Sequence, residues 1–190
     1  MPLSLHETTV KTFIRQLKNL SACMRKAEQW CDDTGKSHTE LLEARLAPDM
    51  YPLHYQIRAA TINARNGVLL NNGQWSWVST KAHASDERDF AGLQARIQWT
   101  VEWLGTVREE DIEGGEEVSF DVWIDGTVGQ GRGVRVPTGQ TLLMQTVFPQ
   151  FWFHEAMAYA ICRMKGVSLG KHDFMAGGSP MDHSPIEAQA

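Results

Sequence analysis

Four stretches of the sequence repeat apolar residues every three or four positions, which is the spacing of one face of an α-helix. They cover approximately residues 8–31, 53–68, 90–104 and 141–165. The first is the longest, and its stripe consists of Val10, Phe13, Ile14, Leu17, Leu20, Met24, Ala27 and Cys31. Helices of this kind must bury their stripes against one another, so the sequence predicts a mainly all-α, up-down four-helix bundle around one core.

The predicted helix ends follow from local signals. SLHE at 4–7 and SHTE at 37–40 are capping-box patterns, which predict helix starts at Ser4 and Ser37. DDTGK at 32–36 is expected to end the first long helix. Asp49, three residues before Pro52, is expected to cap the second long helix, and NNG at 71–73 to close it. Ser85 or Asp86 is the expected cap of the third long helix. In the fourth, Pro149 should bend the helix or mark its effective start, and Gly166 should end it.

Between residues 116 and 136 the apolar period changes from helical to two. Val118, Phe120, Val122 and Ile124 alternate with other residues, and the pair DG at 125–126 is a turn signal. We therefore expect an inserted β-hairpin before the last long helix, with GQGRG at 129–133 as its tip. Trp75 and Trp77 alternate as in a short strand or a packed loop. No linker divides the chain, so residues 1–178 are expected to form a single domain and residues 179–190 a flexible tail.

Composition narrows the function classes. Hydrophobic residues make up 42% and charged residues 22% of the chain, the net charge is −5, and no block of Lys and Arg occurs. This argues against binding to nucleic acid or to an anionic membrane. The three cysteines have no C-x-x-C spacing, and the N-terminus has no apolar signal-peptide segment. A cytoplasmic protein with reduced thiols is the expectation.

The stretch PQFWFHEAMAYAICR at 149–163 places a histidine and a glutamate in the middle of an apolar helix. His154 shares a face with Phe151 and Ala158. The opposite side is also apolar, so the helix is expected to be buried nearly all round; that side consists of Phe153, Met157, Ala160 and Met164. His154 is either a neutral core histidine with one hydrogen bond or a metal-free acid/base. Glu155 is expected to pair with Arg163, Lys165 or an arginine of another helix, or else to act as a base.

Two motifs resemble a known family. RLAPDMYPLHYQ at 45–56 and PQFWFHEAMAYAICRMKGVSLGKHDF at 149–174 are similar to an uncharacterised domain-of-unknown-function family of bacteria and fungi, grouped with the DinB/YfiT-like superfamily. The resemblance implies an up-down four-helix bundle and allows a homodimer. Better-known superfamily members bind a divalent metal through one histidine on the second helix and an H-x-x-x-H pair on the fourth. Known activities there include thiol transfer and a thiol-dependent isomerisation.

Carried over by position, the resemblance makes His54 and His154 candidate metal ligands for Zn or Ni. Ala158 stands where the third ligand would be. Two imidazoles make a poor site unless a carboxylate completes it, and Asp49 is the carboxylate whose position allows this. The expected chemistry is therefore independent of metal and of other cofactors.

The function expected from these observations is a small-molecule enzyme with an apolar pocket inside the bundle, of the isomerase, cyclase or transferase kind. His154 would be the acid/base, assisted by Glu155, Tyr159 or Asp49. The expected substrate-binding residues are His54, Gln56, Phe151 and Trp152. One alternative is a divalent-metal-dependent DinB-type transferase or hydrolase, and another is a non-catalytic ligand-binding bundle. Trp99 and Trp103, four positions apart, are expected in the core or on a dimer surface.

Overall fold

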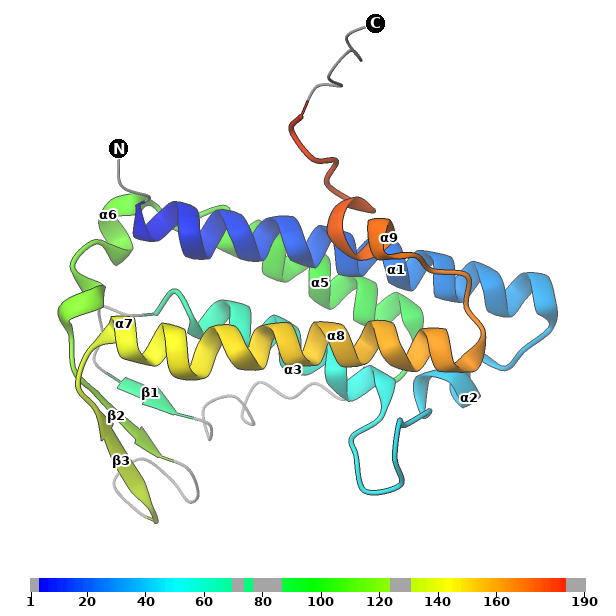
Figure 1. Cartoon of the computed structure of the whole chain (residues 1–190), viewed down its shortest axis with the longest axis horizontal. Coiled ribbons are helices and arrows are strands. Elements are labelled where there is room, and N and C mark those ends of the chain that lie inside the picture. The colour runs from blue at the N-terminus through cyan, green and yellow to red at the C-terminus, as the bar shows by residue number, and fades with distance from the viewer. Residues whose placement is uncertain (1–3, 70–73, 77–86, 124–130, 184–190) are drawn as a thin grey trace, which may run out of the picture.

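The computed structural model describes residues 4–69, 74–76, 87–123 and 131–183, with the backbone alone at 74–76 and Trp123. Four long helices run side by side (Figure 1). They are α1 (Thr12–Thr34), α3 (Leu53–Asn66), α5 (Phe90–Leu104) and α8 (Phe148–Lys165). Shorter helices are α2 (His38–Leu42), α6 (Glu109–Ile112), α7 (Gly139–Leu142) and α9 (Lys171–Ala176). The strands are β1 (Gln74–Ser76), β2 (Phe120–Trp123) and β3 (Gly133–Val136). The predicted four-helix bundle with an inserted hairpin is confirmed.

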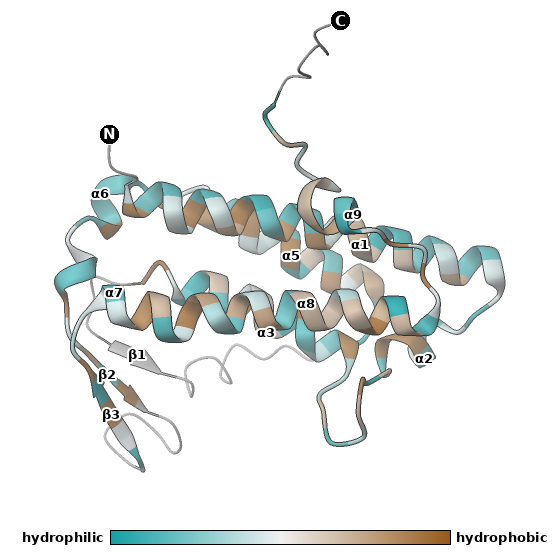
Figure 2. Cartoon of the chain, in the orientation of Figure 1, coloured by the Kyte–Doolittle hydropathy of each residue, from teal (hydrophilic) through white to brown (hydrophobic). Residues whose placement is uncertain are grey.

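Helix α1 begins and ends as its sequence predicts. The Ser4 hydroxyl accepts a hydrogen bond from the Glu7 amide at 3.2 Å, and a wide turn over Glu7–Lys11 leads into the helix. Gly35 ends it with a φ of 65°, a conformation that glycine adopts at no steric cost. Apolar and hydrophilic residues alternate along α1 (Figure 2), and the apolar stripe is the buried side of the helix.

Two predicted helix caps are wrong. Helix α3 has Pro52 at its N-cap position without a side-chain cap, whereas Asp49 lies exposed in the preceding turn. The amides of Tyr55 and Gln56 bond to the Pro52 carbonyl, so the chain turns into the helix after Asp49. Helix α5 is capped by Asp89, which accepts from the Gly92 amide at 2.7 Å, and not by Ser85 or Asp86, which lie outside the described residues.

Helix α3 also ends earlier than predicted. Its last residue is Asn66, and Gly67 is the C-cap, so the expected terminator NNG at 71–73, outside the described residues, is not what ends it. A Cβ atom at Gly67 would lie 2.7 Å from the Val147 side chain and 2.8 Å from the Phe13 ring. The helix ends where this close approach requires a glycine.

The last long helix starts in stages, because Pro149 lies in its first turn. The Thr138 hydroxyl caps α7 by accepting from the Thr141 amide, a wide turn over Leu143–Val147 follows, and α8 begins at Phe148. Gly166 ends α8 with a φ of 100°. These boundaries agree with the predicted start near Thr141 and end at Lys165.

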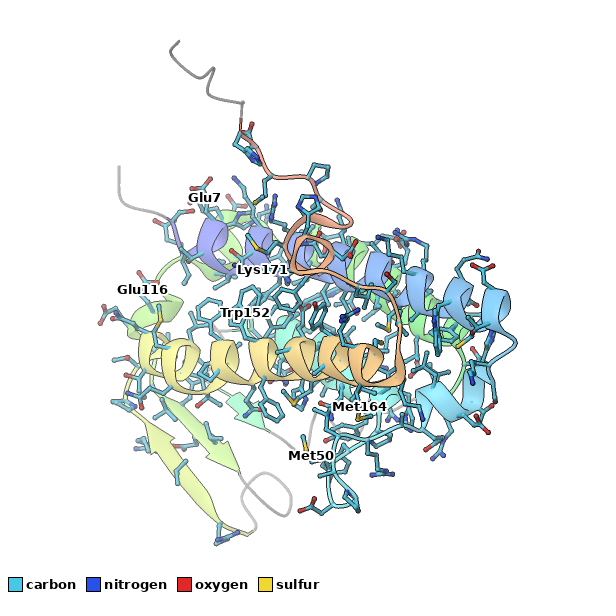
Figure 3. The ribbon with its side chains drawn as sticks, turned by 45° about the vertical axis from the view of Figure 1, so that its right-hand side comes forward. Glu7, Met50, Glu116, Trp152, Met164 and Lys171 are labelled. Carbon is cyan, nitrogen blue, oxygen red and sulfur yellow. The ribbon has the colours of Figure 1, made fainter. Side chains whose placement is uncertain are left out.

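One expectation about α8 is wrong. The helix is not buried nearly all round: Phe153 is 49% and Met164 is 50% exposed, while Phe151 and Ala158 are fully buried. Its inner face packs chiefly on α3, whereas Phe153 and Met164 lie on the outer side. Met164 lies on the side toward the α2–α3 connection and Met50, whereas Trp152 lies on the side toward α1 (Figure 3).

The sheet lies at the end of the bundle where α7 begins (Figure 1). The predicted hairpin is present as antiparallel β2 and β3, with Phe120 opposite Val136. Strand β1 adds a parallel partner to β2, so the sheet has the order β1-β2-β3. Phe120 and Val122 point into the common core. The turn residues 124–130 lie outside the described part of the chain.

The junction between the hairpin and α7 depends on Gly139. A Cβ atom at this position would lie 2.0 Å from the Gly115 carbonyl oxygen, and backbone atoms cannot yield as a flexible side chain does. We expect Gly139→Ala to lower the free energy of unfolding by about 1–3 kcal/mol, as overpacking does. Urea unfolding followed by circular dichroism measures this change.

The matched control is Gly170→Ala. The nearest atom to a Cβ there is Asp173 Oδ2 at 3.8 Å, an ordinary contact. Because Gly170 is a helix N-cap, this change should cost less than about 1 kcal/mol. Equal losses in the two variants would contradict the role given to Gly139.

Candidate functional site

His154 joins the fourth long helix to the second through one hydrogen bond. Its Nδ1 lies 2.7 Å from Gln56 Oε1, and the Gln56 Nε2 donates to the Tyr51 carbonyl at 2.9 Å. A carbonyl only accepts, so the NH₂ group of Gln56 must face Tyr51 and its oxygen must face His154. His154 Nδ1 therefore carries the proton, and Nε2 carries a free lone pair.

Aromatic rings surround the imidazole. The Tyr55 ring lies edge-on at 6.1 Å between centroids and the Phe153 ring at 5.4 Å. Tyr51 stacks on Tyr55 at 3.9 Å. Tyr51 is 58% exposed and Phe153 half exposed, so these rings form a patch at the surface rather than an enclosed cavity. We call Tyr51, Tyr55, Phe153 and His154 the His154 patch.

The His154 ring is neutral near pH 7. Its partial burial lowers the pKa of the imidazole to about 4, because the charged form loses water that the aromatic surroundings do not replace. In the described part of the chain, no carboxylate forms an ion pair with this ring. His154 Nε2 is thus a hydrogen-bond acceptor that protons do not occupy at neutral pH.

Glu155 faces a different side of α8 and has no ionic partner among the described residues. It is 1% exposed, and burial raises the pKa of its carboxyl well above the usual range, opposed by a weaker effect of a hydrogen bond from Gln16. The expected ion pair with Arg163 or Lys165 is not found: Arg163 Nη1 donates to the Val167 carbonyl at 3.0 Å. Burial therefore favours the protonated, neutral form of Glu155.

A buried polar network continues from Glu155 to α9 and to the residues Gly178 and Ser179 that follow it. Gln16 Nε2 donates to the Phe174 carbonyl at 2.9 Å, and Asn19 Nδ2 bonds both Gln16 Oε1 and the Met175 carbonyl. Asn19 Oδ1 accepts from the amides of Gly178 and Ser179. The network fastens α9 and the residues after it to α1, which is a structural task.

Tyr159 and Trp152 belong to the same docking region. Both rings contact Phe174 of α9, at 5.8 and 6.5 Å between centroids, and the Tyr159 hydroxyl donates to the Leu169 carbonyl at 3.5 Å. Phe151 is fully buried against Phe13. Of the residues expected in the site, these three line the core or contact α9.

His54 and Asp49 are separate from His154 as well. His54 is buried, and its Nε2 lies 3.5 Å from Oε1 of Glu43, the C-cap residue of α2. Asp49 is exposed in that connection. Of the residues that the sequence predicts to join His154, Gln56 is the one that forms a hydrogen bond with it in the part of the chain that the structure describes.

The residues present do not fit the three-ligand metal site of the superfamily. Ala158, at the third ligand position, is fully buried and offers no donor atom. Within the ranges that the structure describes, no group of three His, Cys, Asp or Glu side chains is placed to hold one ion. The Zn or Ni site predicted at His54 and His154 stays a prediction.

Three cavities lined by described residues, of about 460, 440 and 280 Å³, lie between α3 and α5, at the hairpin and beside α6. His154 and Glu155 line none of these three. The predicted apolar pocket around His154 therefore does not coincide with any of them. The surface beside His154 is formed by the exposed rings of Tyr51 and Phe153.

One part of this arrangement has a signal in the sequence that the predictions did not use, and another part has none. Gln16 and Asn19 fall on the apolar stripe of α1, between Phe13 and Leu20, and polar residues at such positions need buried partners. Tyr51 and Tyr55 are four positions apart, but Tyr51 precedes the helix. Their stacking follows from the turn at Pro52 and could not be read from helical spacing.

The first prediction from the site concerns Glu155. The carboxyl has a raised pKa in the folded protein, so it stabilises the fold least at high pH, where the unfolded chain gains by ionising it. Glu155→Gln removes this effect and should raise stability relative to the natural protein more at pH 8 than at pH 5. Urea unfolding at the two pH values measures the difference.

Glu113→Gln, a change at an exposed glutamate, is the control and should give the same effect at both pH values. If Glu155→Gln were equally destabilising at pH 5 and pH 8, Glu155 would be ionised in the fold.

The second prediction concerns His154, whose pKa is lowered in the fold. Between about pH 6.5 and pH 4 the imidazole of His154 is protonated in the unfolded chain but not in the folded protein. The free energy of unfolding therefore falls as pH falls through this range. His154→Gln should remove up to about 3 kcal/mol of this loss. His172→Gln, at an exposed histidine, should leave the loss unchanged. An imidazole NMR titration of His154 centred near pH 6.5 would refute the assignment.

Comparisons with known proteins agree with the fold. A family described as a domain of unknown function, DUF1993, matches residues 5–175. No match was found among the curated proteins. The chain is similar to the crystal structure of a DinB family member protein from Shewanella denitrificans, with 28% identity, a TM-score of 0.78 and 96% of both chains covered. The chain therefore belongs to the DUF1993 family, and its fold is a DinB-like four-helix bundle.

Proposed function

We propose that the protein binds a small, largely apolar molecule on the His154 patch, and that His154 Nε2 accepts a hydrogen bond from a hydroxyl or N–H group of that molecule. The observation that carries this proposal is the Gln56 contact, which fixes the proton on Nδ1. The exposed rings of Tyr51 and Phe153 supply apolar surface beside the acceptor. An apolar wall with one oriented polar atom is the usual composition of a ligand site.

Hydrogen-bond acceptance is favoured over acid/base catalysis by the low basicity of His154. With a pKa of about 4, protonation of the ring at pH 7 costs on the order of 4 kcal/mol. An efficient general base has a pKa near the working pH. Glu155, Tyr159 and Asp49, the residues expected to assist, form no hydrogen bond with the ring in the described part of the chain.

An acid/base enzyme of the isomerase, cyclase or transferase kind is the second candidate function. The fixed tautomer favours it, since an oriented imidazole with a free Nε2 is the arrangement that proton transfer uses. Turnover of a bound compound with a rate limb near pH 4, lost in His154→Gln, would establish this activity.

The cellular location and the assembly stay predictions. No helix within the described ranges is both long and apolar enough to span a bilayer. The half-exposed Phe153 and Met164 are consistent with a homodimer. The cytoplasmic location rests on the sequence alone.

The binding proposal is tested with a matched pair of probes. At pH 7, 2-naphthol can donate a hydrogen bond to His154 Nε2, and 2-methoxynaphthalene cannot. We expect 2-naphthol to bind about tenfold more tightly, which corresponds to one hydrogen bond of about 1.4 kcal/mol. NMR titration that follows the His154 imidazole signals measures both affinities.

Two variants give the controls. His154→Leu should remove the difference between the two probes, and His172→Leu should keep it. Phe153→Ala should weaken both probes alike, because it removes apolar wall and no polar atom. Equal affinity of the probes for the natural protein, or a preference that survives in His154→Leu, would refute the proposal.

A further inference from the structure

A second place in the fold combines a cavity, an aromatic wall and a cation. The cleft of about 460 Å³ lies between α3 and α5, two helices in direct contact. Its lining comprises Arg65, Glu87, Gly92, Ala95, Arg96, Trp99 and Thr100. The volume is within the range of small-molecule sites. On α3, Arg65 is nine residues beyond Gln56, roughly 14 Å along the helix axis, so the cleft is separate from the His154 patch.

Arg65 is the residue of this cleft whose charge lacks an anion. Its guanidinium carbon lies 4.7 Å from the centroid of the Trp99 ring and 5.2 Å from that of Trp103. No carboxylate of the described chain pairs with it, and its buried Nε has no hydrogen-bond acceptor. Arg65 is held by two indole rings, which stabilise a cation without neutralising it.

The neighbouring arginine is already engaged. Arg96 donates its Nε to the Thr61 hydroxyl at 2.7 Å, and its Nη1 lies 3.3 Å from both oxygens of Glu87. Burial lowers the pKa of Arg65, and the charge of Arg96 lowers it further. An anion that entered the cleft would relieve the second effect.

The shape and chemistry of the wall narrow the kind of anion. Trp99 is 48% exposed and offers a flat apolar surface beside the guanidinium. Ala95, one turn before Trp99 on α5, and Gly92, two turns before it, also line the cleft and are small residues. A guanidinium binds a carboxylate through two parallel N–H···O bonds, and one unneutralised cation matches one negative charge.

We propose that the α3–α5 cleft binds a planar organic carboxylate, with its carboxylate on Arg65 and its apolar ring against Trp99. This binding function is additional to the one proposed for the His154 patch and does not depend on it.

The test uses 2-naphthoate and its neutral analogue 2-naphthamide. We expect 2-naphthoate to bind at least tenfold more tightly to the natural protein. The indole N–H signals of Trp99 and Trp103, assigned from Trp99→Phe and Trp103→Phe, should shift on addition of 2-naphthoate. Shifts confined to other tryptophans would place the ligand elsewhere and refute the proposal.

Variants separate charge from packing. Arg65→Met keeps the apolar stem and should reduce 2-naphthoate affinity at least tenfold while leaving that for 2-naphthamide unchanged. Arg65→Lys keeps the positive charge and should retain part of the preference for 2-naphthoate over 2-naphthamide. Arg25→Met, at an exposed arginine of α1, and His154→Leu should have no effect. Loss of binding in Arg25→Met equal to that in Arg65→Met would indicate general charge attraction and overturn the assignment.

Discussion

The burial of α8 against α3 is the constraint on which the rest of the structure depends. Phe151, Ala158, Ile161 and Cys162 of α8 are completely buried, and the extensive contact between these two helices removes water from that side of the helix. Any polar group on the inner part of α8 must exist there without its hydration. His154 and Glu155 respond in opposite directions, because burial lowers the pKa of an imidazole and raises that of a carboxyl. In both cases burial favours the neutral form.

Each of these neutral groups is paired with a glutamine of another helix. Gln56 of α3 binds His154, and Gln16 of α1 binds Glu155. A glutamine amide both donates and accepts without carrying charge, so it satisfies a neutral partner at a low desolvation cost. The two pairs differ in what covers them. The Glu155 side is closed by α9, whereas the His154 side ends at the exposed Tyr51 and Phe153. This difference separates a structural network from a surface suited to a ligand.

The likeness to a DinB family protein extends over the whole fold, but function resides in particular side chains. In this chain the third position of the superfamily metal site is Ala158, and His54 points to Glu43. The polar groups to which we assign recognition are the Nε2 of His154 and the guanidinium of Arg65. His154 forms a hydrogen bond with Gln56 of α3, and Arg65 is itself a residue of α3. This helix therefore contributes to both proposed sites.

Most of the fold could be predicted from the sequence, because apolar spacing, capping boxes and the change to a period of two are local signals. They gave the four long helices, the hairpin, and helix ends such as Gly35 and Gly166 correctly. The predicted N-cap residues of α3 and α5 were wrong. Several polar residues near each helix start could act as the cap, and the path of the preceding loop determines which residue occupies the N-cap position. Strand β1 was left open, because its pairing with β2 joins segments distant in the sequence.

The sequence by itself determined that His154 and Glu155 lie in an apolar helix, that Ala158 removes a metal ligand, and that the chain resembles a DinB-like bundle. Only the tertiary structure decided their partners. Gln56, Gln16 and Arg65 reach their neighbours across helix interfaces, and the rotation of one helix against another sets which side chains meet. Helical periodicity specifies the face of a residue but not the residue opposite to it, so the pairing of charges, amides and rings appears only in the assembled bundle.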